Sequence, residues 1–483
     1  MPATDEEILQ LPPREMLAII RGLERQVKAQ DVRLAAQDVR LAALIKEVAK
    51  LREVIRESHR SKAPFSKGTG KTRPKKPGRH AGKGKFAQRP EPVATPADEI
   101  QNIDVPLDVD QRQCPKCQTP LETANEEVTV EDMPPAPRRV IKRFTVEVGR
   151  CLRCGYRVRG KHPEIGPHHC GAAAHQVGPN ALAAALALHY QSGLPMRKVP
   201  AVIEQHTGIK IGQSALTQAA GRLSHSGGIM EPHYAALREH IRTSPVVNTD
   251  DTGWRIGSTP CFLMGFFTHS TAVYQVRHQH RHQEVLEVLG TGFAGMLGTD
   301  RGSSYEAHEM DEMQMQKCLS HILKNLSAVE ETKTGRAKTF STQLKATLRE
   351  SIKLWHEERA GALERADYLA RAEALDDRLT HQLRARELSD ADNQRMLDGI
   401  GKQHERGRLT LFLLEPEIEP TNNRAERGLR PAVIARKVSQ CSKNARGAHT
   451  YEVMKSIFTT LALRTQSVVS TFAALLRGEP FPS

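Results

Sequence analysis

Four short apolar runs between residues 245 and 300 constrain the fold of this chain more than any other feature. The first three lie between residues 245 and 280, are rich in β-branched and aromatic residues, and are joined by brief turns. Such a series predicts an antiparallel meander of strands. A helical pattern follows at 281–289, and a fourth apolar run ends at Asp300. This order predicts an α+β core built around one sheet.

Acidic residues stand at the ends of the first and fourth runs. Asp250 and Asp251 close the first run, Asp300 follows the fourth, and Glu426 lies in the first turn of a later helix. Carboxylates on two neighbouring strands and on a helix packed over them can hold two Mg²⁺ ions about 4 Å apart for in-line phosphoryl transfer. This is the layout of a ribonuclease-H-like nuclease fold. Because side chains alternate along a strand, only one of Asp250 and Asp251 can point into such a site.

Each of these acids also has a simpler explanation. Asp before Thr-Gly or Arg-Gly is a common turn signal, which covers Asp250, Asp251 and Asp300. Glu426 stands three residues after Asn423, which is the spacing of a capping box. Three acids in this order on these elements nevertheless favour a shared metal site over three unrelated turns and caps.

Two Cys-x-x-Cys pairs account for four of the eight cysteines in the chain. Cys114 and Cys117 form the first pair and Cys151 and Cys154 the second, with a spacer that reads as strands. Each pair can present two thiolates from a tight turn, so the four complete a tetrahedral site for structural Zn²⁺. A redox dithiol needs one pair, and the cysteines are too sparse for a disulfide scaffold. Three nearby residues could replace a ligand: His168, His169 and Cys170.

The formal charge of +14 is concentrated in residues 60–89, which carry eleven Lys or Arg and no acid. Such a Gly/Pro-rich segment cannot fold alone, but it can neutralise DNA phosphates. A merely solubilising linker is the alternative. No apolar run approaches the roughly 18 residues of a spanning helix, and the N-terminus lacks an apolar signal core, so we expect a cytoplasmic protein without a membrane partner. The expected phosphate contacts are Lys75, Lys76, Arg79, Lys83 and Lys85.

The N-terminal residues 14–58 carry a heptad pattern, with "AQDVRLA" repeated in tandem. Val27, Leu34, Leu41 and Val48 recur every seven residues. Such a stripe needs a partner helix, which predicts self-association as a coiled coil, with packing on the chain's own surface as the alternative.

Helical patterns continue in residues 180–223. The first follows a plausible Asn180 cap and stops at Gly193. A helix, a glycine-containing turn and a second helix at 213–223 then resemble a helix-turn-helix, although any helical hairpin has this pattern. The residues that could face a DNA groove are Gln213, Ser214 and Gln218.

Two features accompany the acids in the C-terminal half. Cys318 and His321 lie one helical turn apart, a spacing that more often reflects core packing than metal ligation. Basic residues cluster around Glu426, where a DNA strand would pass, and a solvated basic face is the alternative. The expected phosphate contacts there are Arg424, Arg427, Arg430, Arg436 and Lys437.

Four blocks of the sequence, "NTDDTGWRI", "GTDRGSSY", "KCLSHILKNL" and "PTNNRAERGLRPAVIARKV", resemble the insertion-sequence-66 family of bacterial DDE transposases. The similarity extends to the cysteine pairs, the basic segment and the N-terminal helix. It implies that Asp250, Asp300 and Glu426 are the metal-binding triad. The family's first block usually reads Asp-Glu-Thr, so Asp251 stands in place of the Glu. Cys318 and His321 match a Cys-x-x-His block of the family.

The resemblance implies a transposase that binds terminal inverted repeats, cleaves the ends of its element and transfers the 3′-OH to target DNA, with Mg²⁺ or Mn²⁺. It further implies double-stranded DNA as the partner, a homo-oligomer, small accessory proteins and a location at the bacterial nucleoid. Two alternatives are a ribonuclease-H-like nuclease or resolvase without strand transfer, and a catalytically inactive zinc-containing DNA-binding regulator.

The expected organisation has seven parts. They are an N-terminal helix or coiled coil (1–58), a basic linker (59–95), a zinc-binding module (100–170), a helical DNA-binding region (175–240), the first part of the ribonuclease-H-like core (244–328), a helical insertion (329–405) and the C-terminal part of the core (406–475).

Overall fold

The computed structural model describes residues 177–415, 417–439 and 441–482, together with 139–160, 162–165, 118–120, residue 104 and scattered residues between 12 and 48. The basic segment, Cys114 and Cys117 lie outside the described residues. The chain divides into two compact units, Met1–Gln88 and Arg89–Ser483. Across the described part of the chain, no helix has the length and apolar character needed to cross a membrane.

In the first unit, the described residues between 14 and 48 are α-helical. The heptad side chains Val27, Leu34, Leu41 and Val48 are between 46% and 56% exposed. A stripe of this size in contact with water is what a helix shows when its packing partner is another chain. Coiled-coil association therefore stays a prediction, and the exposed apolar side chains of the heptad positions support it.

A small hairpin surrounds the second cysteine pair. Its strands, β1 (Val148–Arg150) and β2 (Arg157–Arg159), pair antiparallel. Between them the chain makes a tight turn in which the Gly155 N–H donates to the Cys151 carbonyl at 2.9 Å and Gly155 adopts a φ of +74°. A glycine is favoured at that φ because it has no Cβ. The strands are shorter than the sequence predicts, since residues 139–147 have no regular structure.

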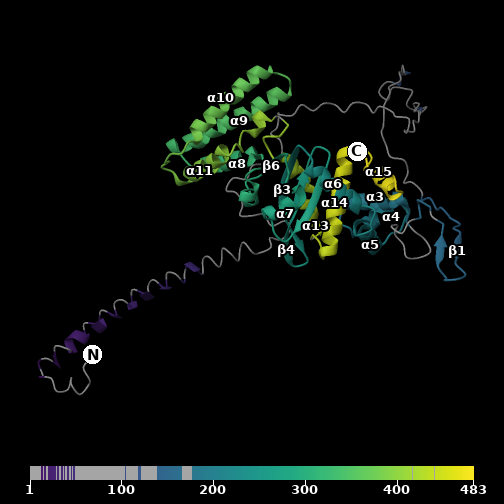
Figure 1. Ribbon diagram of the computed structural model, residues 1–483, viewed down its shortest axis with the longest axis horizontal. Coiled ribbons are helices and arrows are strands. Elements are labelled where there is room, and N and C mark those ends of the chain that lie inside the picture. The colour runs from purple at the N-terminus through teal and green to yellow at the C-terminus, as the bar shows by residue number, and fades with distance from the viewer. Residues whose placement is uncertain are drawn as a thin grey trace. The chain divides into compact units, whose positions relative to one another are not determined.

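The core of the second unit is a five-stranded mixed sheet (Figure 1). The first three strands form the predicted antiparallel meander, and the fourth pairs with the first in the parallel direction. The last strand is three residues long and was not predicted, because so short a run has no readable period. In spatial order the strands are β5 (Ala272–Arg277), β4 (Thr259–Phe267), β3 (Val246–Ile256), β6 (Met296–Thr299) and β7 (Met315–Lys317).

The outer edge of β5 is covered by α14 (Ala445–Arg464). The N–H groups of Ala272, Tyr274 and Val276 donate to Thr460 Oγ1, Ser456 Oγ and Glu452 Oε1, at 3.1, 2.8 and 2.6 Å. Four residues of a helix advance about 6 Å and two residues of a strand advance about 6.7 Å. Every fourth side chain of α14 can therefore meet every second N–H group of β5. Side chains of the helix thus satisfy an edge that would otherwise expose unpaired donors.

Seven further helices, α13 (Asn423–Ser439) among them, share one hydrophobic cluster with the sheet and α14. Figure 1 shows α13 and α14 alongside the strands. The expected helix-turn-helix segment is present as two helices separated by a turn that contains Gly208 at a φ of +69°. Besides α13, they are α3 (Pro179–Tyr190), α4 (Val199–Thr207), α5 (Gln213–Ser224), α6 (Glu231–Arg242), α7 (His282–Leu289) and α15 (Val468–Leu476).

The expected Asn180 cap is wrong. Helix α3 begins at Pro179, and Gly178 occupies the N-cap position. Proline suits the first helical position because its φ is already helical and it has no N–H to satisfy. The Asn180 side chain instead accepts a hydrogen bond from Arg477 at 2.6 Å.

Helices after β7 build a second hydrophobic cluster. The Gln316 side chain joins this cluster to the sheet, because its Nε2 donates to the Leu409 carbonyl at 3.0 Å and its Oε1 accepts from Phe412 N at 3.1 Å. The chain then returns to the sheet through α13 (Asn423–Ser439). The helices of the second cluster are α8 (Leu319–Thr332), α9 (Thr339–Arg359), α10 (Arg365–Leu383), α11 (Ala391–Glu405) and α12 (Leu411–Leu414).

Candidate active site on β3, after β6 and at the start of α13

Asp250 lies on the face of β3 that meets α13. Its neighbours two residues away on either side both contact the α13 segment: Asn248 Nδ2 donates to Asn422 Oδ1 at 3.1 Å, and Thr252 Oγ1 accepts from Arg436 at 3.1 Å. Alternation along the strand puts Asp250 on the same face. Asp251 lies on the other face, where its Oδ1 is 3.0 Å from His280 Nδ1. Of the two adjacent acids, Asp250 is the one directed toward the helix that carries Glu426.

Asp300 is the first residue after β6, the strand that runs parallel to β3. Its Oδ1 accepts a hydrogen bond from Gly302 N at 2.8 Å. A Cβ at Gly302 would stand 2.9 Å from that oxygen, so a larger residue there would displace the Asp300 carboxylate. The simple turn explanation of Asp300 is therefore correct for one carboxylate oxygen, and the second oxygen is left for another role.

Glu426 lies in the first turn of α13. Its N–H donates to the Asn422 carbonyl at 3.2 Å, which makes Asn422 the N-cap of the helix. The capping box between Asn423 and Glu426, the simpler alternative for Glu426, is therefore not formed, because Asn423 is already the first helical residue. The Glu426 side chain is exposed, and its Oε1 lies 3.8 Å from His321 Nε2.

The charges of two candidate metal ligands, Asp300 and Glu426, act on the third candidate, Asp250. Burial raises the pKa of Asp250 to about 7, and the charges of Asp300, Asp251 and Glu426 add to this rise, against the opposing hydrogen bond from the Asp251 N–H. Negative charges close together in a half-buried position repel one another, and a bound cation offsets this repulsion. The oxygen donors of Asp250, Asp300 and Glu426 are those that Mg²⁺ prefers, so the residues fit this metal.

Cys318 and His321 stand beside this triad. Cys318 is the N-cap of α8, and its sulfur accepts a hydrogen bond from Asn422 N at 3.1 Å. The pKa of His321 is raised to about 9 by the Cys318 sulfur, against burial, with the Glu426 and Asp300 charges adding to the rise. Sequence reasoning favoured core packing for the pair, and it missed that His321 reaches Glu426. The one available signal was the Cys-x-x-His spacing at the start of a helix.

The predicted DNA contacts of α13 divide into two groups. Arg427, Arg430 and Lys437 are exposed. Arg436, in contrast, hydrogen-bonds to Thr252 Oγ1 and the Gly253 carbonyl, so it binds the helix to β3. Arg424 pairs with Glu419 at 2.7 Å. A hollow of about 290 Å³ has Arg424, Arg427 and Lys455 among its lining residues.

The other predicted site residues that the structure describes lie on α5 and in the β1–β2 hairpin. Gln213 and Ser214 are exposed at the start of α5. Cys151 and Cys154 are exposed free thiols, and hydrogen bonds from the Cys154 and Arg153 N–H groups lower the pKa of the Cys151 thiol. Such N–H donors favour the thiolate form that a metal binds. The partner pair lies outside the described residues.

The comparison with protein families decides the class of the chain. A profile described as "Transposase IS66 family" matches residues 174–450, which is 277 of the 483 residues. The chain belongs to the IS66 family of transposases. Membership implies an enzyme of the polynucleotidyl-transferase type that binds DNA, uses a divalent metal and forms oligomers. The α+β core of this transposase is built around the five-stranded mixed sheet described above.

Two solved structures show a partial likeness to the chain. One is the HTLV-2 integrase catalytic core domain in complex with magnesium, at 9% identity and a TM-score of 0.14, covering 20% of this chain and 81% of that one. Another is the catalytic domain of the Mos1 mariner transposase, at 11% identity and a TM-score of 0.13, covering 39% and 91%. A search of curated proteins found no match.

Proposed function

We propose that this transposase has a ribonuclease-H-like core in which Asp250, Asp300 and Glu426 bind Mg²⁺ or Mn²⁺, cleave DNA at the ends of its element and join the freed 3′-OH to target DNA. One observation carries the proposal: burial raises the pKa of Asp250 on β3, and the charges of Asp300, in the turn after β6, and of Glu426, on α13, add to this rise. The strand order, with β6 parallel to β3, supports the ribonuclease-H-like layout.

The three carboxylates divide the work by their environments. A bound pair of divalent ions would supply activation of the attacking oxygen and stabilisation of the leaving oxygen. Asp250 is half-buried within its strand, so it provides the fixed ligand. Asp300 is oriented by the Gly302 N–H. Glu426 is exposed at the surface of α13, where it can adjust to the DNA strand.

Exposed cations near Glu426 support a path for DNA over α13. Arg427, Arg430 and Lys437 can neutralise backbone phosphates next to the triad. On α5, Gln213 and Ser214 lie on the exposed face at the helix start, as a groove-reading helix requires. Phosphate contacts by the basic segment of residues 60–89 complete the proposed DNA surface.

Two further modules belong to the proposal. The knuckle at Cys151 and Cys154 supplies half of a zinc site that Cys114 and Cys117 complete. The N-terminal helix self-associates through its exposed heptad stripe. Two ends of an element need two active sites, so self-association would bring two triads into one complex.

Joining of pre-cleaved DNA tests the function. End-sequence DNA that already carries a free 3′-OH is incubated with the protein, Mg²⁺ and a second duplex. The proposal expects covalent joining by the wild type and none by Asp300→Asn. A wild type that cleaves intact ends but never joins pre-cleaved ones would make the protein a nuclease or resolvase. A wild type that does neither, while binding the ends, would make it a regulator.

A further inference from the structure

We propose that Cys318, His321 and Glu426 form a second metal site, which takes a Zn²⁺-type ion and withdraws Glu426 from the triad. One ligand atom from each of the three residues lies within 4.8 Å of the other two. No other group of this kind is found in the part of the chain that the structure describes. That Glu426 is shared between two sites rests on the proposed function; that the three residues bind a metal does not.

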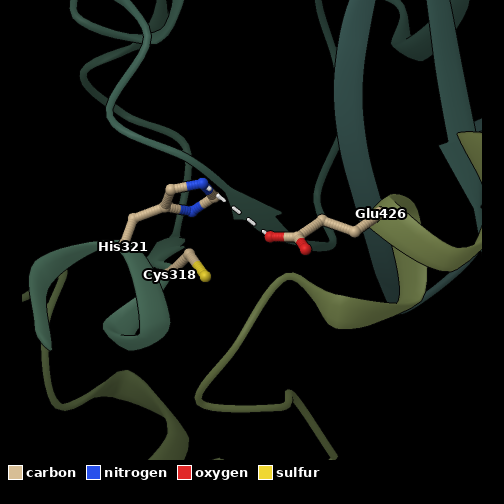
Figure 2. A group of neighbouring side chains, drawn as sticks. All are labelled: Cys318, His321 and Glu426. Carbon is tan, nitrogen blue, oxygen red and sulfur yellow. Dashed lines mark ion pairs between the residues drawn. The ribbon is translucent and has the colours of Figure 1, made fainter. Parts of the chain in front are cut away.

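The two helices deliver the ligands to one point. Cys318 caps α8 and His321 follows one turn later, so both side chains lie on the same side of that helix. Glu426 comes from α13, and Figure 2 shows its carboxylate facing the His321 ring, at 3.8 Å between Oε1 and Nε2. His321 Nδ1 is fully buried and makes no hydrogen bond of ordinary length among the described residues, while the imidazole ring interacts with the Cys318 sulfur. A buried ring nitrogen without such a bond needs a proton acceptor, a donor or a metal ion.

The Cys318 sulfur is held in place for such a role. Its hydrogen bond from Asn422 N, at 3.1 Å, joins the start of α13 to the start of α8. This bond leaves sulfur lone pairs for a metal. In a tetrahedral zinc site, neighbouring ligand atoms stand about 3.5 Å apart, given metal–ligand distances of about 2.0 to 2.3 Å. Glu426 is exposed, so a small rotation of its side chain closes the remaining gap.

The donor set selects the ion. Sulfur, imidazole nitrogen and one carboxylate oxygen suit Zn²⁺, whereas Mg²⁺ prefers oxygen alone. The triad of Asp250, Asp300 and Glu426 has the opposite preference. Because Glu426 has one carboxylate, a zinc ion held by Cys318 and His321 competes with Mg²⁺ for it. The expected consequence is that micromolar zinc inhibits Mg²⁺-dependent cleavage.

A second cysteine–histidine pair provides a matched control. Cys261 Sγ lies 3.3 Å from His278 Nδ1, but the structure groups no carboxylate with them as a third metal ligand among the described residues. Cys261→Ser therefore removes a buried cysteine beside a histidine without touching the proposed site.

Cobalt titration of the full chain tests the site. The protein is first saturated with zinc at its tight sites and dialysed, and Co²⁺ is then added while the absorption of the cobalt–thiolate bond is recorded. The wild type and Cys261→Ser should show one further cobalt–thiolate site. Cys318→Ser should lose this absorption, and His321→Ala should weaken Co²⁺ binding by at least the roughly 10- to 100-fold that loss of an outer-sphere partner costs.

The outcomes separate this site from the proposed function. Asp250→Asn combined with Asp300→Asn should keep the cobalt site, because neither residue is one of its ligands. The proposal would be overturned if Cys318→Ser kept the wild-type melting temperature and still showed the full cobalt–thiolate absorption of the wild type. His321→Ala covers the case in which Cys318→Ser fails to fold: unchanged Co²⁺ affinity in that variant would equally overturn it. Zinc binding that persists while the double Asp variant still cleaves DNA would instead contradict only the proposed triad.

Discussion

The Asn422 side chain is hydrogen-bonded to the main chain of Thr249, with 2.7 Å between Asn422 Nδ2 and the Thr249 carbonyl oxygen. Asn422 is the N-cap of the helix that carries Glu426, and Thr249 directly precedes Asp250. Asn422 Oδ1 also accepts from Asn248 Nδ2 at 3.1 Å. One buried amide therefore sets the distance between two proposed metal ligands that are far apart in the sequence.

Asn422→Ala should impair both stability and cleavage. The change leaves a buried carbonyl and a buried amide without partners, which costs about 1–3 kcal/mol of unfolding free energy. Cleavage should fall further than the loss of folded protein explains, because the start of α13 is no longer tied to β3. Chemical denaturation and end cleavage of the same samples measure the two effects. Asn423→Ala, one residue along, keeps the tie and is the control; equal effects in both variants would contradict this role of Asn422.

Asp250 should make the protein less stable at neutral pH when Mg²⁺ is absent. Its pKa is raised to about 7 in the folded state, so between about pH 4 and 7 the unfolded chain loses this proton first, and the cost grows with pH. Above pH 7 the cost is complete, at most a few kcal/mol, since one pKa unit corresponds to about 1.4 kcal/mol.

Thermal unfolding of Asp250→Asn checks this expectation. The variant should be more stable than the wild type at pH 8 without Mg²⁺ and should gain nothing at pH 4. Added Mg²⁺ should narrow the difference at pH 8, because it stabilises only the wild-type site. If Asp250→Asn and the wild type had the same stability at pH 8 as well as at pH 4, the charged Asp250 carboxylate would not destabilise the folded protein.

Ser456→Ala tests the cover over the edge strand. The Tyr274 N–H would lose its acceptor at a buried position, so the unfolding free energy should fall by about 1–3 kcal/mol. Denaturant unfolding at constant temperature measures the change. Ser470→Ala removes an exposed hydroxyl from the neighbouring helix and should alter stability by less than about 0.5 kcal/mol. Similar values for both would mean that the α14 side chains do not support β5.

The parts of the fold with a clear local signal could be predicted from the sequence. The meander, α7 and β6 have readable periods and turn residues, and the pairing of β6 with β3 follows from the expected layout. Strand β7 has three residues and no period. The Asn180 cap was wrong because Pro179 takes the first helical position. Each of these differences depends on the local conformation of only a few residues.

The acids of the candidate site could be predicted from the sequence, but their arrangement in space could not. The sequence could not choose between Asp250 and Asp251 by residue type, because strand parity depends on which face meets α13. The roles of Asn422 and Cys318 depend on a contact between segments about 100 residues apart. Side chains that position a helix start leave no pattern in the local sequence, so only the folded arrangement reveals them.

The cleavage rates of Asp250→Asn and Asp251→Asn, measured side by side on end-sequence DNA with Mg²⁺, test the central claim most directly. Asp250→Asn should lower the rate by about a thousandfold or more, because it removes a metal ligand. Asp251→Asn should stay within about tenfold of the wild type, since its carboxylate contacts His280 on the other face of the sheet. The reverse order, with Asp251→Asn inactive and Asp250→Asn active, would contradict the assignment of the triad.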